Sequence, residues 1–163
     1  MPIIKHGRIE ESSWIHLADE DALPAQGACT VGAERWLSAR EELSEAAKAG
    51  RLGLRVSGDT DLEAIAGDLA SLALVAVAFA SLADGRGFSV ARLLRDAYGY
   101  KGELRAYGNF LPDQLQFMTR CGFDSFEFTS ERDLEKARAL LTEFSVSYQS
   151  GTDAPPLYRR QQG

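Results

Sequence analysis

Along the central part of the chain, short apolar segments typical of β-strands alternate with longer segments whose apolar residues have helical spacing. The segment 72–79 is apolar and uncharged, which predicts a strand buried on both faces. Further strands are predicted at 28–31, 52–56, 103–107 and 125–128. Apolar residues at helical spacing follow each strand, at 33–49, 60–69, 89–98, 109–121 and 129–144. This alternation predicts βα units around a mainly parallel sheet.

Local signals place the helix boundaries. Gly50, Gly99 and Gly122 are expected to end helices, and Ser89 is expected to be the N-cap of the helix that follows the central strand. Pro112 is expected in the first turn of a helix, where its missing N–H is harmless.

Three of the strands carry polar side chains on one face, which bears on the architecture. The polar residue of the strand 52–56 is Arg55, those of 103–107 are Glu103, Arg105 and Tyr107, and that of 125–128 is Glu127. A doubly wound sheet needs two apolar faces, so this pattern favours helices on one side only and a partial (β/α) barrel. Arg55 and Arg105 are then expected to pair with Glu103 and Glu127, because unpaired buried charges are costly. A flavodoxin-like doubly wound sheet with solvated edge strands stays open.

The chain is expected to form one α/β domain over residues 28–149. An N-terminal arm or hairpin is expected over 1–27, around the polar turn at His6 and Gly7. A flexible tail is expected over 150–163, and a further edge strand over 145–149.

Composition narrows the class of protein. The net charge of -6 argues against a general nucleic-acid binder or a binder of anionic membranes. No apolar run is long enough to span a bilayer, and the N-terminus lacks the layout of a signal peptide. Two cysteines make neither a disulfide framework nor a CxxC motif. A cytoplasmic protein is expected, with no predicted metal or cofactor.

The loops after the strands are the expected place for a site, since ligands of parallel βα folds bind there. The loop 83–89 is the richest in candidates: two glycines allow close approach to a ligand, an arginine can clamp an anion, and a helix begins nearby. Arg105 and Asn109 are added from the next unit, although an ion pair and helix capping are their ordinary roles. The predicted ligand-binding residues are Asp84, Gly85, Arg86, Gly87, Ser89, Arg105 and Asn109. The alternative is that this loop is purely structural.

The remaining candidates are expected to be structural. Arg92 and Arg95 lie off the apolar stripe of their helix, which predicts a solvated face. His6 and His16 are expected to lie at the surface or to pack in the hairpin, and neither is expected to bind a metal. Cys29 and Cys121 are not expected to be nucleophiles.

Several runs of residues resemble a bacterial family of unknown function. They are Phe79 with Asp84-Gly85-Arg86-Gly87-Phe88-Ser89, then Ala91-Arg92-Leu93-Leu94-Arg95, Gly102-Glu103-Leu104-Arg105-Ala106, Gly108, Asp113-Gln114 and Arg120-Cys121-Gly122-Phe123-Asp124-Ser125-Phe126. Members of that family are described as oxidoreductases involved in sulfite reduction. One departure is Phe79-Ala80-Ser81-Leu82, where family members read Phe-Pro-x-Phe.

The resemblance implies a place in assimilatory sulfur metabolism. The residues themselves show no dinucleotide fingerprint and no cluster-binding cysteines, so they leave open whether the protein is an enzyme. The first hypothesis is an accessory or anion-binding protein of assimilatory sulfate or sulfite reduction, with the enzymes of that reduction and a small anion as partners. The alternatives are an oxidoreductase or other enzyme acting on a small anionic substrate, and a homo-oligomeric interaction module, such as a homodimer.

Overall fold

A curled sheet organises the part of the chain that the computed structural model describes, residues 2–83 and 85–140. Its eight strands lie in the order β2-β1-β8-β7-β6-β5-β4-β3. The strands are β1 (Pro2–Lys5), β2 (Arg8–Glu11), β3 (Ile15–His16), β4 (Cys29–Gly32), β5 (Leu52–Val56), β6 (Leu74–Phe79), β7 (Glu103–Gly108) and β8 (Ser125–Phe128).

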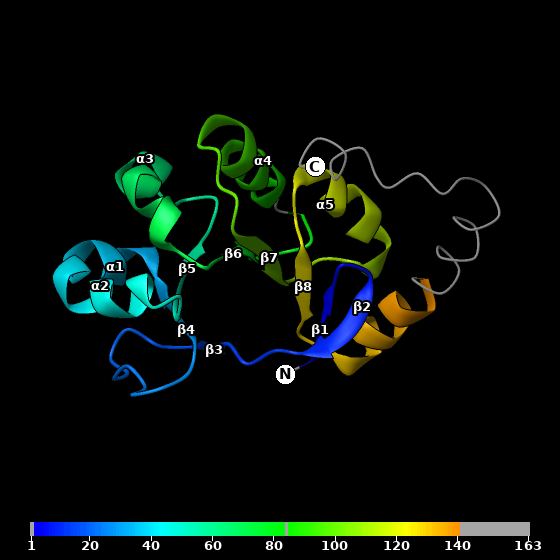
Figure 1. Ribbon diagram of the computed structural model, residues 1–163. Helices are drawn as coiled ribbons and strands as arrows, with labels where there is room; N and C mark the ends of the chain where they lie inside the picture. Colours follow the sequence, from blue (N-terminus) through cyan, green and yellow to red (C-terminus); the bar gives the residue numbers. More distant parts are fainter. Residues whose placement is uncertain (1, 84, 141–163) are drawn as a thin grey trace.

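Strand order decides between the two predicted architectures. Strands β3 to β8 are parallel and lie side by side in chain order, while the hairpin of β1 and β2 joins β8 antiparallel. The helices form an arc around one side of the sheet, and the chain between β2 and β3 crosses the other side (Figure 1). The predicted partial barrel is confirmed, and the flavodoxin-like alternative is wrong, because its strand order would not be sequential.

The helices lie between successive parallel strands and after β8. They are α1 (Ala33–Ser38), α2 (Arg40–Lys48), α3 (Leu62–Ile65), η1 (Ala66–Ser71), α4 (Arg86–Arg92), η2 (Leu93–Ala97), η3 (Pro112–Gln114) and α5 (Leu115–Cys121). Here η1 and η3 are 3-10 helices, and η2 is a π-helical turn that continues α4. Residues 131–140 are also helical. The predicted helix over 33–49 is broken at Ala39, whose φ of -135° is not helical.

The apolar core lies between the convex face of the sheet and the helices. Register places Leu54, Val75 and Leu104 side by side on that face, and all three are fully buried. Strand β6 is buried on both faces as predicted, with Val75 and Ala76 each 0% exposed. The concave side of β6 carries small alanines, which leaves room there for the long polar side chains of the neighbouring strands.

Most predicted helix boundaries are confirmed. Gly50, Gly99 and Gly122 all follow helices and take positive φ. Pro112 begins η3, and the Ser130 hydroxyl accepts a hydrogen bond from the Asp133 N–H, which caps the helix at 131–140.

The prediction for Ser89 is wrong. Helix α4 begins at Arg86, so Ser89 lies inside it, and Gly85 is the N-cap residue. The helix therefore begins four residues earlier than the capping signal at Ser89 indicated.

The N-terminal region is integrated into the sheet. Strands β1 and β2 form a hairpin around the turn at His6 and Gly7, and β3 then pairs parallel with β4. Among the described residues, no helix is long and apolar enough to cross a membrane. The predicted edge strand at 145–149 and the tail at 150–163 lie outside the described residues.

Candidate functional site

The loops at the carboxyl ends of three neighbouring strands contact one another. The Arg86 guanidinium, after β6, lies 2.6 Å from a carboxylate oxygen of Asp59, after β5. The side-chain amide of Asn109, after β7, donates a 2.9 Å hydrogen bond to the Ala80 carbonyl. We call these loops (57–61, 80–83, 85–86 and 109–110) the rim. The expectation that they share one edge of the sheet is confirmed by these contacts.

Arg86 lies on the solvent side of the rim. Its side chain is 56% exposed, and that of its partner Asp59 is 80% exposed. Exposed ion pairs contribute only about 0–1 kcal/mol. The Arg86–Asp59 contact therefore positions the guanidinium at the rim without fixing it strongly.

The two glycines of the loop have different surroundings. A Cβ at Gly85 would meet no atom within 4 Å. A Cβ at Gly87 would lie 2.5 Å from the Phe79 ring, so Gly87 allows α4 to approach β6 closely. Gly87 therefore has a role in packing between helix and strand, and ligand binding by this glycine stays a prediction. Asp84, another of the predicted ligand-binding residues, lies outside the described residues, so its role stays a prediction.

Asn109 joins loops and does not cap a helix. The N-cap residue of η3 is Leu111, whose N–H donates to the side-chain carbonyl of Gln114 at 3.1 Å. The capping role expected for Asn109 is therefore wrong, because its amide is bonded to Ala80 instead.

Arg105 lies on the concave face of the sheet, below the rim. It pairs with Ala76 in the register of β6 and β7, three residues before the pair Phe79–Gly108 at the strand ends. That separation is roughly 10 Å along the strands. The structure therefore brings Asn109 to the loop of Arg86, but it does not bring Arg105 there.

The Arg105 side chain is the centre of a buried polar network. It is 1% exposed and lies 2.8 Å from Glu103 and 3.4 Å from Glu127. It also donates to the hydroxyls of Ser125 and Ser12. The predicted ion pairs of Arg105 are confirmed, and they give the guanidinium a structural role.

Arg55 does not join those ion pairs, which corrects the prediction for it. Its guanidinium donates to both the carbonyl and the hydroxyl of Thr30, at 2.9 and 2.8 Å, and to the Leu17 carbonyl. Neutral oxygens from the neighbouring strand and the segment that follows β3 therefore take the place of a carboxylate.

Sequence reasoning missed the role of His16. Its Nε2 lies 2.8 Å from Glu127, its Nδ1 lies 2.6 Å from the Thr30 hydroxyl, and its ring stacks on Tyr107 with centroids 5.3 Å apart. Because a carboxylate only accepts hydrogen bonds, Nε2 carries a proton that it donates to Glu127, while the Thr30 hydroxyl bonds Nδ1 on the other side of the ring. A histidine in a two-residue strand gave no signal for these contacts.

We call residues 12–17 the strap. It crosses the concave face from Ser12, bonded to Arg105, to Leu17, whose N–H donates to the Thr30 carbonyl. The Thr30–His16–Glu127 arrangement has the order of a catalytic triad, but Thr30 is 0% exposed, so no substrate reaches its hydroxyl. The contacts hold the strap in place.

The electrostatics of the network follow from its contacts. Burial alone would raise the pKa of Glu127, but hydrogen bonds from His16 and Arg105 and their charges outweigh it and lower the pKa. Burial would also raise the pKa of Glu103, but the hydrogen bonds and charges of Lys5 and Arg105 outweigh it, so the pKa is lowered. Burial raises the pKa of the Tyr107 hydroxyl. Both carboxylates are therefore ionised and balanced by neighbouring cations.

Arg95 contradicts the predicted solvated face. Its side chain is 10% exposed and lies 2.7 Å from Asp124. Its guanidinium also donates to the carbonyls of Tyr100, Gly102 and Gly122. Arg92, on the same helix, is exposed as predicted. The π-helical turn at 93–97 alters the direction in which Arg95 points. The prediction assumed an α-helix and therefore placed Arg95 on the exposed side.

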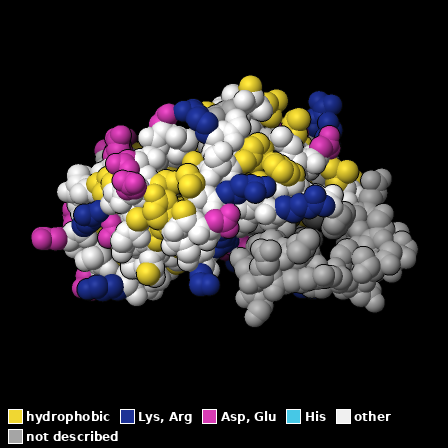
Figure 2. Space-filling view, turned by 90° about the horizontal axis from the view of Figure 1, so that it is seen from above, with side chains coloured by type: hydrophobic (Ala, Val, Ile, Leu, Met, Phe, Trp, Pro, Cys, Tyr) yellow, Lys and Arg dark blue, Asp and Glu magenta, His cyan; other side chains and the backbone are white. Residues whose placement is uncertain are grey.

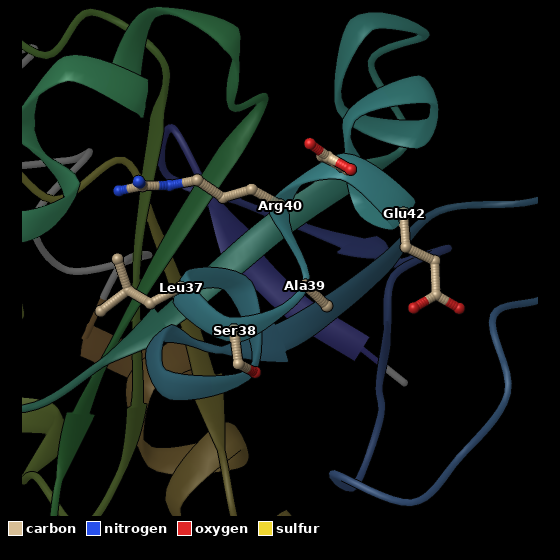
Figure 3. Close-up of a pocket in the computed structure, with 6 residues that line it drawn as sticks. Leu37, Ser38, Ala39, Arg40 and Glu42 are labelled. Atoms are coloured by element: carbon tan, nitrogen blue, oxygen red, sulfur yellow. The ribbon is translucent and has the colours of Figure 1, made fainter.

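A shallow hollow lies at the break between α1 and α2 (Figure 3). Arg40 extends from it to the Ala64 carbonyl and to Asp68, while Glu42 points away. The arginine is thus already held by a carboxylate, and the hollow offers no seat for an anion. Among the residues described, no group of three or more His, Cys, Asp or Glu side chains could hold a metal ion.

Comparison with known proteins bears on the family alone. No curated protein and no solved structure matches the chain at a significant level. The family model described as "Bacterial protein of unknown function (DUF934)" matches residues 53–158, which is more than half of the chain and includes all the rim loops. The chain therefore belongs to this family of bacterial proteins of unknown function.

Proposed function

We propose that the protein is an accessory protein of assimilatory sulfate or sulfite reduction that binds a small oxyanion at the rim. The link to sulfur metabolism rests on the resemblance of its sequence motifs to a family described in those terms. The observation that supports the location is the exposed guanidinium of Arg86, positioned where the loops after β5, β6 and β7 contact one another.

The energetics of the Arg86 ion pair favour exchange of its partner. An exposed pair contributes about 0–1 kcal/mol, whereas a bidentate oxyanion on an arginine makes two charge-assisted hydrogen bonds. An incoming sulfite or sulfate can therefore replace the Asp59 carboxylate at little cost. Asp59 then acts as a competitor, because its negative charge occupies the same guanidinium in the absence of the anion.

Titration calorimetry with sulfite, sulfate and adenylylated sulfate tests this proposal. We expect heat from at least one of them with the native chain and none with Arg86→Ala. Asp59→Asn is expected to tighten binding, since it removes the competing charge. Arg8→Ala, which removes an exposed arginine from the hairpin, serves as the matched control and is expected to bind as the native chain does.

Absence of heat with all three anions for both the native chain and Asp59→Asn would contradict anion binding at the rim. Binding that survives Arg86→Ala would move the site elsewhere. In either case the sulfur assignment would lose its structural support.

A further inference from the structure

The outer side of α4 and α5 carries a second surface, distinct from the rim. These helices follow the neighbouring parallel strands β6 and β7 and lie side by side. The Phe88 ring of α4 meets the Phe117 ring of α5 edge to face, with centroids 5.2 Å apart. Phe117 is 46% exposed, so this aromatic pair is open to solvent on one side.

Two arginines extend this surface by one helical turn. Arg92 lies four residues after Phe88, and Arg120 lies three residues after Phe117, so each arginine is on the same face of its helix as the aromatic residue. Both are exposed. Within the described part of the chain neither forms an ion pair, although Asp96 and Asp113 lie on the same two helical segments.

The loops that precede the two helices add exposed apolar side chains. Leu82 is 60% exposed before α4, and Leu111 is 44% exposed before η3 and α5. Figure 2 shows apolar and basic side chains close together on the side of the molecule that carries α3, α4 and α5. We call Phe88, Arg92, Leu111, Phe117 and Arg120 the α4–α5 face.

We propose that the α4–α5 face is the docking site for an acidic, amphipathic segment of a partner protein. Exposed aromatic residues and arginines are enriched at protein interfaces, where apolar contacts supply affinity and charges select the partner. The two guanidiniums, which form no ion pair with the described residues, lie beside the aromatic pair. They match carboxylates placed about one helical turn from apolar side chains.

Charge also argues against a second copy of this chain as the occupant. In a symmetric contact between two copies this face would meet itself, and its five residues include two arginines and no carboxylate. An acidic segment of a different protein is attracted locally by Arg92 and Arg120. The proposal is independent of anion binding, since none of the five residues of the face forms a rim contact.

Site-specific photo-crosslinking in cells that express the protein tests the proposal. A photoreactive residue replaces Gln116, which is exposed on α5, and the control position is the exposed Lys48 on α2. We expect a cross-link specific to position 116. Mass spectrometry is expected to place it in a segment whose acidic residues lie three or four positions from apolar ones. A synthetic peptide of that segment is then titrated against the native chain.

Two charge-reversal variants complete the test. Arg92→Glu with Arg120→Glu is expected to weaken binding of the peptide about tenfold or more. Lys48→Glu with Lys136→Glu makes the same change in net charge at exposed positions outside the face and is expected to leave binding unchanged.

Several results would overturn the proposal. One is equal peptide affinity for the two charge-reversal variants. Another is no cross-link above that of the Lys48 control. A third is a cross-link to a second copy, to nucleic acid or to residues 141–163 of the same chain. Circular dichroism of the variants would separate loss of docking from loss of folding. Calorimetry with sulfite on the Arg92→Glu, Arg120→Glu variant distinguishes failure of docking from failure at the rim.

Discussion

His16 and Glu127 are 111 positions apart in the sequence, yet Nε2 of the one lies 2.8 Å from Oε2 of the other. The bond joins β3, at one edge of the sheet, to β8, and strands β4, β5, β6 and β7 lie between the two. Such a contact is possible only because the sheet is curled. The bond holds the strap across the concave, open side of the half-barrel.

Replacing His16 tests whether this bond holds the strap. His16→Ala leaves the Glu127 carboxylate with one hydrogen-bonding partner fewer, and we expect the free energy of unfolding to fall by about 1–3 kcal/mol. Hydrogen exchange is expected to accelerate at the Leu17 N–H, which donates to Thr30, and to stay slow in β6. Ile15→Ala, at a neighbouring side chain that is 51% exposed, is the control with little expected change.

Removing Arg105 tests the buried network. Arg105→Met leaves Glu103 and Glu127 without their shared cation, and we expect a loss of about 3–5 kcal/mol in chemical denaturation. Adding Glu103→Gln and Glu127→Gln to the same chain is expected to recover part of that loss. If the triple variant were no more stable than Arg105→Met, unpaired charge would not be the cause.

The lowered pKa values of Glu103 and Glu127 predict the acid dependence of stability. Folding lowers both pKa values, so in the unfolded chain each group binds a proton at higher pH than in the folded chain. Their contribution is therefore fully present above the ordinary value of 4.5 and is lost as pH falls through the lower folded pKa. Urea unfolding between pH 7 and pH 3 is expected to show a shallower decline for Glu103→Gln, Glu127→Gln than for the native chain.

Gly87 and Gly85 form a matched pair for packing at α4. Gly87→Ala places a Cβ 2.5 Å from the Phe79 ring, and we expect destabilisation of about 1–3 kcal/mol from the forced shift. Gly85→Ala meets no atom within 4 Å, so thermal unfolding is expected to show a smaller effect. Similar melting temperatures for the two variants would contradict the role assigned to Gly87.

Arg95 is expected to be more important for stability than its neighbour Arg92. Arg95→Ala removes the donor of three backbone carbonyls and the partner of Asp124, which predicts a loss of about 3–5 kcal/mol. Arg92→Ala removes an exposed side chain and is expected to change unfolding by less than about 0.5 kcal/mol. Comparison of the two by denaturant unfolding checks the assignment.

The parts of the fold that the sequence predicted depend on short-range patterns. The uncharged run of β6, the polar faces of β7 and β8, and the glycines after helices each encode their own environment locally. The polar faces also favoured helices on one side only and thus a partial barrel, although they left a flavodoxin-like sheet open.

The contacts that were missed depend on the long-range path of the chain. Nothing near His16 indicates that Glu127 will face it, and the pattern around Arg95 assumes an α-helix where the chain forms a π-helical turn. The start of α4 was placed at Ser89 because a serine is a good cap, whereas Gly85 takes that position without a side-chain hydrogen bond.

An open half-barrel, unlike a closed one, ends in two strands with unpaired backbone groups. Here one outermost strand, β3, has two residues, and the other, β2, is Arg8-Ile9-Glu10-Glu11 with all four residues exposed. Short or charged borders of this kind discourage pairing with strands of other molecules. The same N-terminal stretch that covers the concave side thus also lowers the tendency of the sheet to aggregate.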